Sequence, residues 1–140
     1  MVRISEEKLV KALMENSRMK FTRLAKLFGV TETAIRKRMK ALEKKGIIRK
    51  YTLEVDPKKL GYEIDALIGI DTEPEMYMSI MNMLKRDNKV IKLYSSSGDH
   101  MIMIRVWLKN YKSLMDFVEK LNRTKGITRV CPATIIEELK

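Results

Sequence analysis

The sequence predicts an α+β chain of two small domains, and three observations support this prediction. Apolar residues recur at helical spacing through the first part of the chain, which also carries most of the positive charge. Further on, short runs of alternating apolar residues, typical of strands, are separated by helical stripes. An Asp56-Pro57 step separates the two patterns. We therefore predict an N-terminal helix-turn-helix (winged-helix-like) domain over residues 1–55, a linker over 56–61, and a C-terminal ferredoxin-like βαββαβ domain over 62–140.

Two short helices are expected at the start of the chain. Ser5 is a candidate N-cap for the first, which would run to about Glu15, because a serine hydroxyl accepts an orphan backbone N–H. The second spans about residues 20–28, and Gly29 then makes a tight turn into a third helix. Two short helices joined by a turn that contains glycine are typical of a helix-turn-helix unit. The spacing alone also fits an ordinary pair of surface helices.

The third helix, from Thr31 to about Glu43, carries the strongest functional signal. Thr31 can cap its start and Gly46 can end it, because glycine readily adopts the left-handed conformation of a helix terminus. Its apolar stripe, Ile35, Met39 and Leu42, would pack on a core. The opposite face is rich in lysine and poor in acids, which attracts phosphate. We interpret this segment as a DNA-recognition helix.

The residues expected to contact double-stranded DNA lie on this helix and just after it. Three of them should lie nearest to base edges, namely Thr33, Ala34 and Lys37, while the basic side chains around them should contact phosphates. The full set is Thr31, Thr33, Ala34, Arg36, Lys37, Arg38, Lys40 and Arg49, with Lys50 next to Arg49.

The distribution of charge supports a nucleic-acid partner for the first domain only. The chain has a net charge of +11. Residues 1–60 hold 17 lysines and arginines against 7 acidic residues, an excess of +10, whereas residues 61–140 hold 12 against 11, an excess of +1. A generally basic, soluble surface would divide the charge more evenly. We therefore expect only the first part to meet a polyanion.

The remaining elements alternate between strand and helix. The run IIRKYTLEV after Gly46 predicts a strand that leads out of the first domain, because it is rich in β-branched and aromatic residues. The order beyond the linker is β-α-β-β-α-β, the ferredoxin-like order. The expected ranges are a strand over 64–71, a helix over 74–85, strands over 90–96 and 101–108, a helix with a stripe of Tyr111, Leu114, Met115, Val118 and Leu121, and a strand over 127–139.

Helices on one face of such a sheet leave the other face uncovered. That face is expected to carry Leu67, Met101, Met103 and Trp107, whereas Met76, Ile80 and Met83 are expected to fill the core. An exposed apolar sheet face usually marks a partner surface, and pairing with an identical face would produce a two-fold dimer.

The chain resembles the Lrp/AsnC family of prokaryotic transcription regulators. RLAKLFGVTETAIRKRMKALEKKGIIRKYT (23–52) is similar to the helix-turn-helix and following strand of that family, DPKKLGY (56–62) to its linker, and SSGDH (96–100) to a turn of its effector domain. The resemblance covers residues 3–139. It implies dimers, or octamers built from dimers, that bind pseudo-palindromic DNA near promoters. It also implies a C-terminal domain that senses amino acids.

In the family the small molecule sits between dimers, near the glycine-aspartate turn and the last strand. The matching positions are Gly98, Asp99 and His100, with Ala133 and Thr134 as neighbours. A carboxylate such as that of Asp99 suits an α-amino group, although Asp99 can also be read as a simple turn residue. The family commonly has a second aspartate where this chain has Met101, and its loss could change the ligand or weaken binding.

Other classes of function fit less well. A nucleoid-type architectural protein with little site preference is the nearest alternative. An enzyme is disfavoured because the single cysteine, Cys131, and the single histidine, His100, lie far apart in the sequence and no glycine-rich phosphate loop is present. The same residue counts argue against a zinc site and an internal disulfide, so we expect no metal and no cofactor besides an amino-acid effector.

Two further classes are disfavoured by composition. An RNA-binding sheet would carry stacking aromatic motifs and positive charge, and the second domain has neither. No apolar run reaches the roughly 18 residues of a membrane-spanning helix, and the start does not read as a signal peptide. We therefore expect a cytoplasmic protein with no membrane partner.

Overall fold

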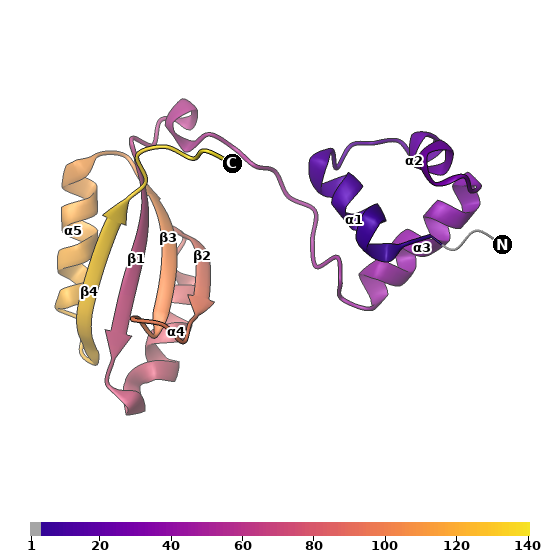
Figure 1. Cartoon of the computed structure of the whole chain (residues 1–140). Helices are drawn as coiled ribbons and strands as arrows, with labels where there is room; N and C mark the ends of the chain where they lie inside the picture. Colours follow the sequence, from indigo (N-terminus) through magenta and orange to yellow (C-terminus); the bar gives the residue numbers. More distant parts are fainter. Residues whose placement is uncertain (1–3) are drawn as a thin grey trace. The chain divides into compact units, whose positions relative to one another are not determined.

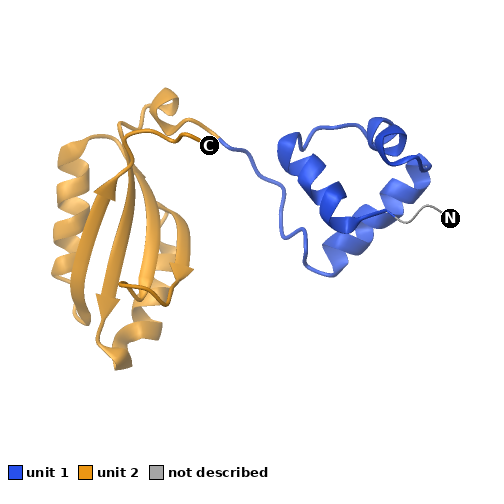
Figure 2. Cartoon of the chain, in the orientation of Figure 1, with its two compact units in different colours: residues 1–54 blue, residues 55–140 orange. Residues whose placement is uncertain are grey.

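The computed structural model describes residues 4–140, which form two compact units that divide between Glu54 and Val55 (Figure 2). Each unit has its own apolar core. The Asp56-Pro57 step belongs to the second unit, where η1 (Pro57–Leu60) forms a 3₁₀ turn that leads into the sheet. Among the described residues no helix combines the length and the apolar character needed to cross a membrane.

The first unit consists of α1 (Glu6–Glu15), α2 (Phe21–Phe28) and α3 (Glu32–Lys44) (Figure 1). The predicted caps are confirmed. The Ser5 hydroxyl accepts a hydrogen bond from the Lys8 N–H at 3.3 Å, and the Thr31 hydroxyl accepts one from the Ala34 N–H at 3.1 Å. Gly29 ends α2 in the left-handed conformation, with φ of 63°. These caps set the lengths of helices that are too short to be stable alone.

The core of the first unit brings one face of each helix together. Leu9 of α1 and Leu24 of α2 are fully buried, and Ile35 and Leu42 of α3 are buried with them. Ala25 is also buried and keeps α2 close to α3, because its side chain is small. The apolar stripe of α3 therefore points inward as predicted, which directs the opposite, lysine-rich face to solvent.

The strand predicted after Gly46 is not formed. Residues 49–56 have no strand pairing, and Tyr51 and Leu53 within this run are exposed. A strand needs a neighbour to satisfy its backbone groups, and the described part of the first unit contains only helices. The composition of the run is therefore that of a strand, but residues 4–140 offer it no partner strand.

The second unit is an antiparallel sheet in the order β2-β3-β1-β4, made from β1 (Ile64–Thr72), β2 (Val90–Ser95), β3 (Ile102–Leu108) and β4 (Ile127–Thr134). Two helices, α4 (Tyr77–Arg86) and α5 (Tyr111–Asn122), pack on one face of it (Figure 1). The 3₁₀ turn η2 (Pro74–Met76) precedes α4. The predicted βαββαβ order is confirmed.

Strand alternation divides the sheet into two faces. Residues with even numbers on β1 and β3 face the helices, and those in the middle of the strands, among them Ile68 and Ile104, are fully buried. We call the other side the open face. Register places there Asp65, Leu67, Gly69 and Asp71 of β1, Met103, Arg105 and Trp107 of β3, Lys92 and Tyr94 of β2, and Arg129, Cys131 and Ala133 of β4.

Two ranges in the second unit differ from prediction. The last strand ends at Thr134 and not at residue 139, because β1 begins at Ile64 and the ladder has no further partner after the Ile135 N–H bonds to the Asp65 carbonyl at 2.7 Å. The stripe of α5 is also shifted. Tyr111 and Met115 are exposed, whereas Phe117, which the prediction omitted, is buried next to Leu114.

Two methionines likewise lie elsewhere than expected. Met83 is exposed, because Ile80 and Leu84 are the α4 residues that face the sheet. Met101 packs against the helix-covered core, and its sulfur accepts a hydrogen bond from the Thr72 N–H at 3.5 Å. The apolar residues left on the open face are therefore Leu67, Met103 and Trp107, with Tyr94 at the β2 side.

Two separate cores predict two separate responses to cavity-forming substitutions. Leu42→Ala and Ile104→Ala each remove a fully buried side chain, one from each unit. Each should lower the free energy of unfolding of its own unit by about 2–5 kcal/mol. Hydrogen exchange followed by peptide mass spectrometry should show faster exchange only in the unit that carries the substitution. Faster exchange in both units from either variant would contradict this prediction.

Candidate DNA-binding surface and effector site

The outward face of α3 presents a row of lysines. Thr33, Lys37, Lys40 and Lys44 are all exposed and lie opposite the buried stripe of the same helix. Within residues 4–140 these three lysines form no ion pair, so their charges are not neutralised by the chain itself. The Thr31 cap fixes where the helix begins, and Ala34, one turn in, is half-buried. A row of unpaired cations on a rigid helix suits a phosphate backbone.

The arginines of α3 are held differently. Arg36 is paired with Glu32 at 2.8 Å, and its guanidinium lies over the Phe21 ring at 5.2 Å. Arg38 turns toward α1, where its guanidinium lies 3.3 Å from the Glu6 carboxylate. The structure therefore separates Arg38 from the face that carries Lys37 and Lys40. Its predicted contact with DNA phosphate would require it to leave Glu6.

Glu6 is shared by two cations. The Lys45 ammonium lies 2.8 Å from the same carboxylate oxygen that Arg38 approaches. The hydrogen bond from Lys45 lowers the pKa of the Glu6 carboxyl below its ordinary value, against a smaller opposing effect of burial, and the charges of Lys45 and Arg38 add to the lowering. Glu6 therefore connects the start of α1 to Arg38 in the middle of α3 and to Lys45 at the end of that helix. Arg49 and Lys50, in the unpaired run after α3, are exposed.

The turn that contains Gly98, Asp99 and His100 lies at one end of the sheet, between β2 and β3. The His100 ring reaches back to β1, with its Nδ1 atom 3.0 Å from Asp71 Oδ2. The backbone N–H of Met101 donates to the other oxygen of Asp71 at 2.9 Å. Asp99 Oδ2 lies 3.6 Å from His100 Nε2, so the histidine ring stands between two carboxylates.

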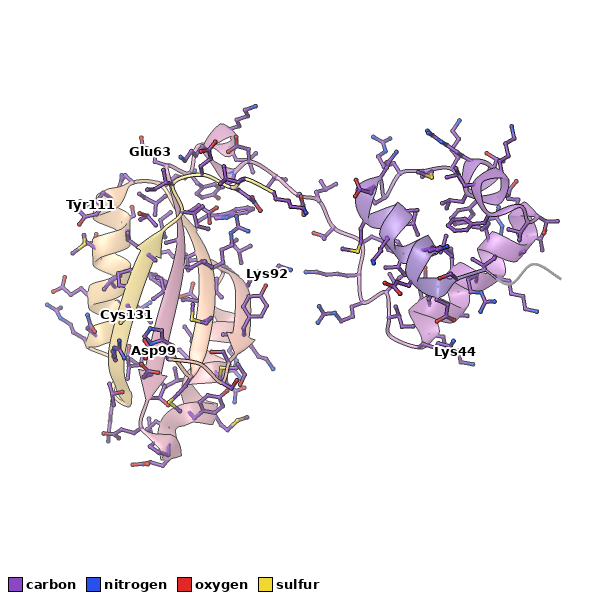
Figure 3. All side chains as sticks on the ribbon, in the orientation of Figure 1. Lys44, Glu63, Lys92, Asp99, Tyr111 and Cys131 are labelled. Atoms are coloured by element: carbon purple, nitrogen blue, oxygen red, sulfur yellow. The ribbon has the colours of Figure 1, made fainter. Side chains whose placement is uncertain are left out.

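A fourth polar residue completes this group. Arg129 of β4 lies directly opposite Asp71 in the sheet register, and its guanidinium is 3.5 Å from Asp99 and 4.0 Å from Asp71. We call Asp71, Asp99, His100 and Arg129 the polar cluster. The side chains of His100 and Asp71 are 15% and 17% exposed, whereas those of Arg129 and Asp99 are 52% and 79% exposed. Figure 3 shows Asp99 on the same side of the sheet as Cys131.

Asp71 and Arg129 were not identified from sequence. Each stands in a strand as an ordinary polar residue, and only the β1–β4 register brings the two together. Asp71 also bears on the unusual Met101. Because the Asp71 carboxylate bonds to the Met101 N–H, this end of the sheet retains two carboxylates even though position 101 has none.

The ionisation of Asp71 reflects opposing effects. Burial raises the pKa of its carboxyl. The hydrogen bonds from His100 and from the Met101 N–H, together with the charge of Arg129, lower this pKa by more than burial raises it. The net result is a pKa below the ordinary 3.8. Asp71 is therefore ionised at neutral pH, and its two oxygens hold the end of the turn against β1.

The structure does not bring Ala133 and Thr134 into the polar cluster. Ala133 is on the open face but pairs with Leu67, so it lies four residues along β4 from Arg129. At about 3.3 Å per residue, that is roughly 13 Å away. Thr134 pairs with Ala66 and belongs to the helix-covered side. Ala133 and Thr134, the two neighbours that the resemblance suggested, therefore lie on opposite faces of their own sheet.

Comparison with known proteins covers both units. Residues 3–49 match a family described as winged helix-turn-helix DNA-binding, and residues 65–140 match the Lrp/AsnC ligand binding domain. The HTH-type transcriptional regulator LrpA of Pyrococcus abyssi is 48% identical over 129 residues, which cover 91% of this chain and 92% of that protein. This chain belongs to the Lrp/AsnC family.

Further relatives agree with this assignment. LrpA of Pyrococcus horikoshii is 46% identical to this Lrp/AsnC regulator over 94% of both chains. The structure of AsnC from E. coli has a TM-score of 0.82 at 27% identity and covers 99% of this chain and 95% of that one. The regulator NMB0573 from Neisseria meningitidis, solved as a complex with L-Met, has a TM-score of 0.87 at 17% identity, covering 100% of this chain and 93% of that one. This protein is therefore a DNA-binding transcriptional regulator with the α+β fold of its family.

The lowered pKa of Asp71 predicts a pH dependence of stability. A carboxyl whose folded-state pKa is lowered contributes stability that is fully present above its unfolded pKa, near 3.8, and is lost as pH falls through the folded value. Asp71→Asn should remove this contribution and lower the free energy of unfolding of the second unit by about 1–2 kcal/mol at pH 7. The stability of the variant should then fall less steeply than that of the wild type below pH 4. Urea unfolding between pH 2.5 and 7 measures this.

The matched control is Asp116→Asn, because Asp116 is exposed on α5 and has no ion pair within the described residues. It should leave both the stability at pH 7 and its acid dependence unchanged. Equal effects of the two substitutions would show that Asp71 has no special role.

Proposed function

We propose that this regulator reads specific DNA sequences by inserting α3 into the major groove, and that its second unit forms a dimer and binds an amino acid that modulates DNA binding. One observation supports the DNA part most directly: the exposed face of α3 carries three lysines without partners in the described chain, opposite a stripe buried in the core. A helix fixed in this way can present its polar side chains to base edges without reorganising.

Residues on that face divide into two roles. Thr33, Ala34 and Lys37 lie in the first turns of α3, the part of a recognition helix that contacts base edges. Lys40 lies further along the helix and suits a phosphate, as do Arg36 at the flank and Arg49 after the helix. An architectural protein with little site preference would use the same charges. The close relatives named as transcriptional regulators do not favour that alternative.

The open face of the sheet supports self-association. Leu67 is exposed, Met103 and Trp107 are half-buried, and the Trp107 indole Nε1–H is buried without an acceptor among the residues that the structure describes. A buried donor without an acceptor is costly, and an apolar face exposed to water is unusual. A second copy packed face to face would cover the apolar residues. Two-fold symmetry would then place two α3 helices on half-sites about 10 base pairs, or a multiple of that, apart.

The polar cluster suits the two charged ends of an amino acid. The exposed Asp99 carboxylate can receive an α-ammonium group, and the Arg129 guanidinium can receive an α-carboxylate. The structural neighbour solved with L-Met is consistent with this class of ligand. A ligand can shift assembly or DNA affinity only by its difference in affinity between the two states.

Selection of bound sequences from random duplex DNA tests the whole proposal. The experiment is run with and without each of the common L-amino acids, while the mass of the protein assembly is recorded. We expect an enriched, roughly palindromic site and a change in affinity or mass with at least one amino acid. Failure to enrich any sequence at fixed salt would favour the architectural alternative.

Substitutions on α3 should separate base contacts from phosphate contacts. Lys37→Ala should reduce affinity for the selected site by about 1–3 kcal/mol and alter preference among sites. Lys40→Ala should weaken all sites alike and reduce the slope of log affinity against log salt by about one. The control is Lys8→Ala, which removes an exposed lysine of α1. Unchanged affinity and preference in Lys37→Ala would refute this orientation of the helix.

A charge placed on the open face should prevent dimer formation. Met103→Lys would bury an ammonium group in the proposed interface, which costs several kcal/mol without a partner. Sedimentation equilibrium at micromolar concentration should then show a monomer, and affinity for a palindromic site should fall. The control is Met78→Lys on the exposed side of α4, which should keep the wild-type mass. A Met103→Lys variant with wild-type mass would place the dimer contact elsewhere.

A further inference from the structure

Gly69 stands in the middle of β1, where a glycine needs an explanation. It is buried, it pairs with Met103 on one side and Cys131 on the other, and its backbone does not adopt a positive φ. Glycine in a strand interior costs stability relative to a residue with a side chain, so conformation alone does not account for it. A strand glycine often marks a close approach by another group.

The group that approaches is the His100 ring. A Cβ atom added to Gly69 would lie 2.2 Å from His100 Cδ2, 2.4 Å from Cγ and 2.8 Å from Nε2. Real Cβ contacts are essentially never below 3.0 Å. The contact is with the body of the ring and not with the end of a flexible chain. Any side chain at position 69 would therefore force the ring to move.

His100 has little freedom to move while its other contacts are kept. Its Nδ1 is 3.0 Å from Asp71, and its carbonyl accepts a hydrogen bond from the Ser96 hydroxyl. The Ser96 N–H in turn donates to the Met101 carbonyl at 3.0 Å. The turn is thus closed at its base by the two contacts of Ser96. It is attached to Asp71 of β1 by the His100 ring and by the Met101 N–H that follows the turn.

Asp99 depends on this attachment. Its side chain is 79% exposed, and its contacts in the described chain are with His100 Nε2 and with Arg129. The position of the Asp99 carboxylate relative to Arg129 is therefore set by where His100 rests.

We infer that His100 is a positioning residue that rests on Gly69 and fixes the separation of Asp99 and Arg129, and that position 69 must be glycine for this end of the sheet to bind an amino acid. This inference rests on the proposed role of the polar cluster in effector binding. It assigns that site a residue, Gly69, that offers no chemical group to a ligand. It also gives His100 a mechanical role and leaves ligand contact to Asp99 and Arg129.

The test uses the full chain in four forms: wild type, Gly69→Ala, His100→Ala and the double variant. Alanine is well tolerated in a strand interior, so Gly69→Ala should fold, and His100→Ala opens the space that the new methyl group needs. The first measurement is isothermal titration with whichever of the twenty common L-amino acids binds the wild type. A displacement of about 1 Å in a positioned group can cost up to 100-fold. We therefore expect at least a tenfold loss of affinity in each single variant.

The double variant distinguishes positioning from general damage. If Gly69 acts only through His100, the double variant should bind no more weakly than His100→Ala alone. His100→Gln, whose amide can still donate to Asp71, should retain more affinity than His100→Ala. DNA affinity without amino acid and assembly mass should be unchanged in all variants. Wild-type binding by Gly69→Ala, or losses that add in the double variant, would overturn the inference.

A second measurement does not require an effector. Hydrogen exchange of the Met101 and Ser96 amides should be faster in Gly69→Ala than in the wild type, and no faster in the double variant than in His100→Ala. If no amino acid binds the wild type but exchange follows this pattern, the effector proposal fails and the contact between Gly69 and His100 stands. If Gly69→Ala instead changes the assembly mass with unaltered exchange, the glycine serves contact between sheets and the inference fails.

Discussion

The second unit depends on the pairing of β1 with β3 on one side and β4 on the other. Because β3 and β4 both pair with β1, the alternation of side chains along β1 determines which side chains of its two neighbours face each side of the sheet. One set of side chains is directed into the helix-covered core and the other to the open face. A slip of one residue would exchange Ile68 for Gly69 in the core and would move Asp71 away from Arg129. Core packing and the polar cluster are thus consequences of the same hydrogen bonds.

In the first unit a small core performs a comparable task. Four fully buried side chains, Leu9, Leu24, Ile35 and Leu42, fix the rotation of α3 about its axis. The pair of Arg38 and Lys45 on Glu6 adds an electrostatic contact on the flank that faces α1. The cations that stay unpaired are those opposite the core. Positive charge is therefore concentrated on one side of α3, although basic residues occur all around it.

Sequence alone was sufficient for the elements and their order, because periodicity, caps and turn glycines are local signals. It failed where an outcome depends on a partner. Residues 47–55 have the composition of a strand but no neighbouring strand among the described residues, and the last strand ends beside the residues where β1 begins. The turn of the candidate site was found through SSGDH. Asp71, Arg129 and Gly69 were missed, because only the strand register and the fold of the turn bring them to His100. Thr134, which the resemblance suggested as a neighbour of the turn, lies on the helix-covered side of its own sheet, because adjacent strand residues face opposite sides.

The outer side of β4 has a consequence for how copies of this chain can meet. Its neighbour β1 lies on one side only, and the Ile135 N–H points toward β1, so alternation directs the N–H of position 132 outward. That position is Pro132, which has no N–H. The exposed margin of the sheet therefore lacks a donor that an incoming strand would need, which discourages growth into continuous ribbons and amyloid-like stacking. The proposed dimer uses the broad open face of the sheet instead, where two-fold symmetry limits the number of copies.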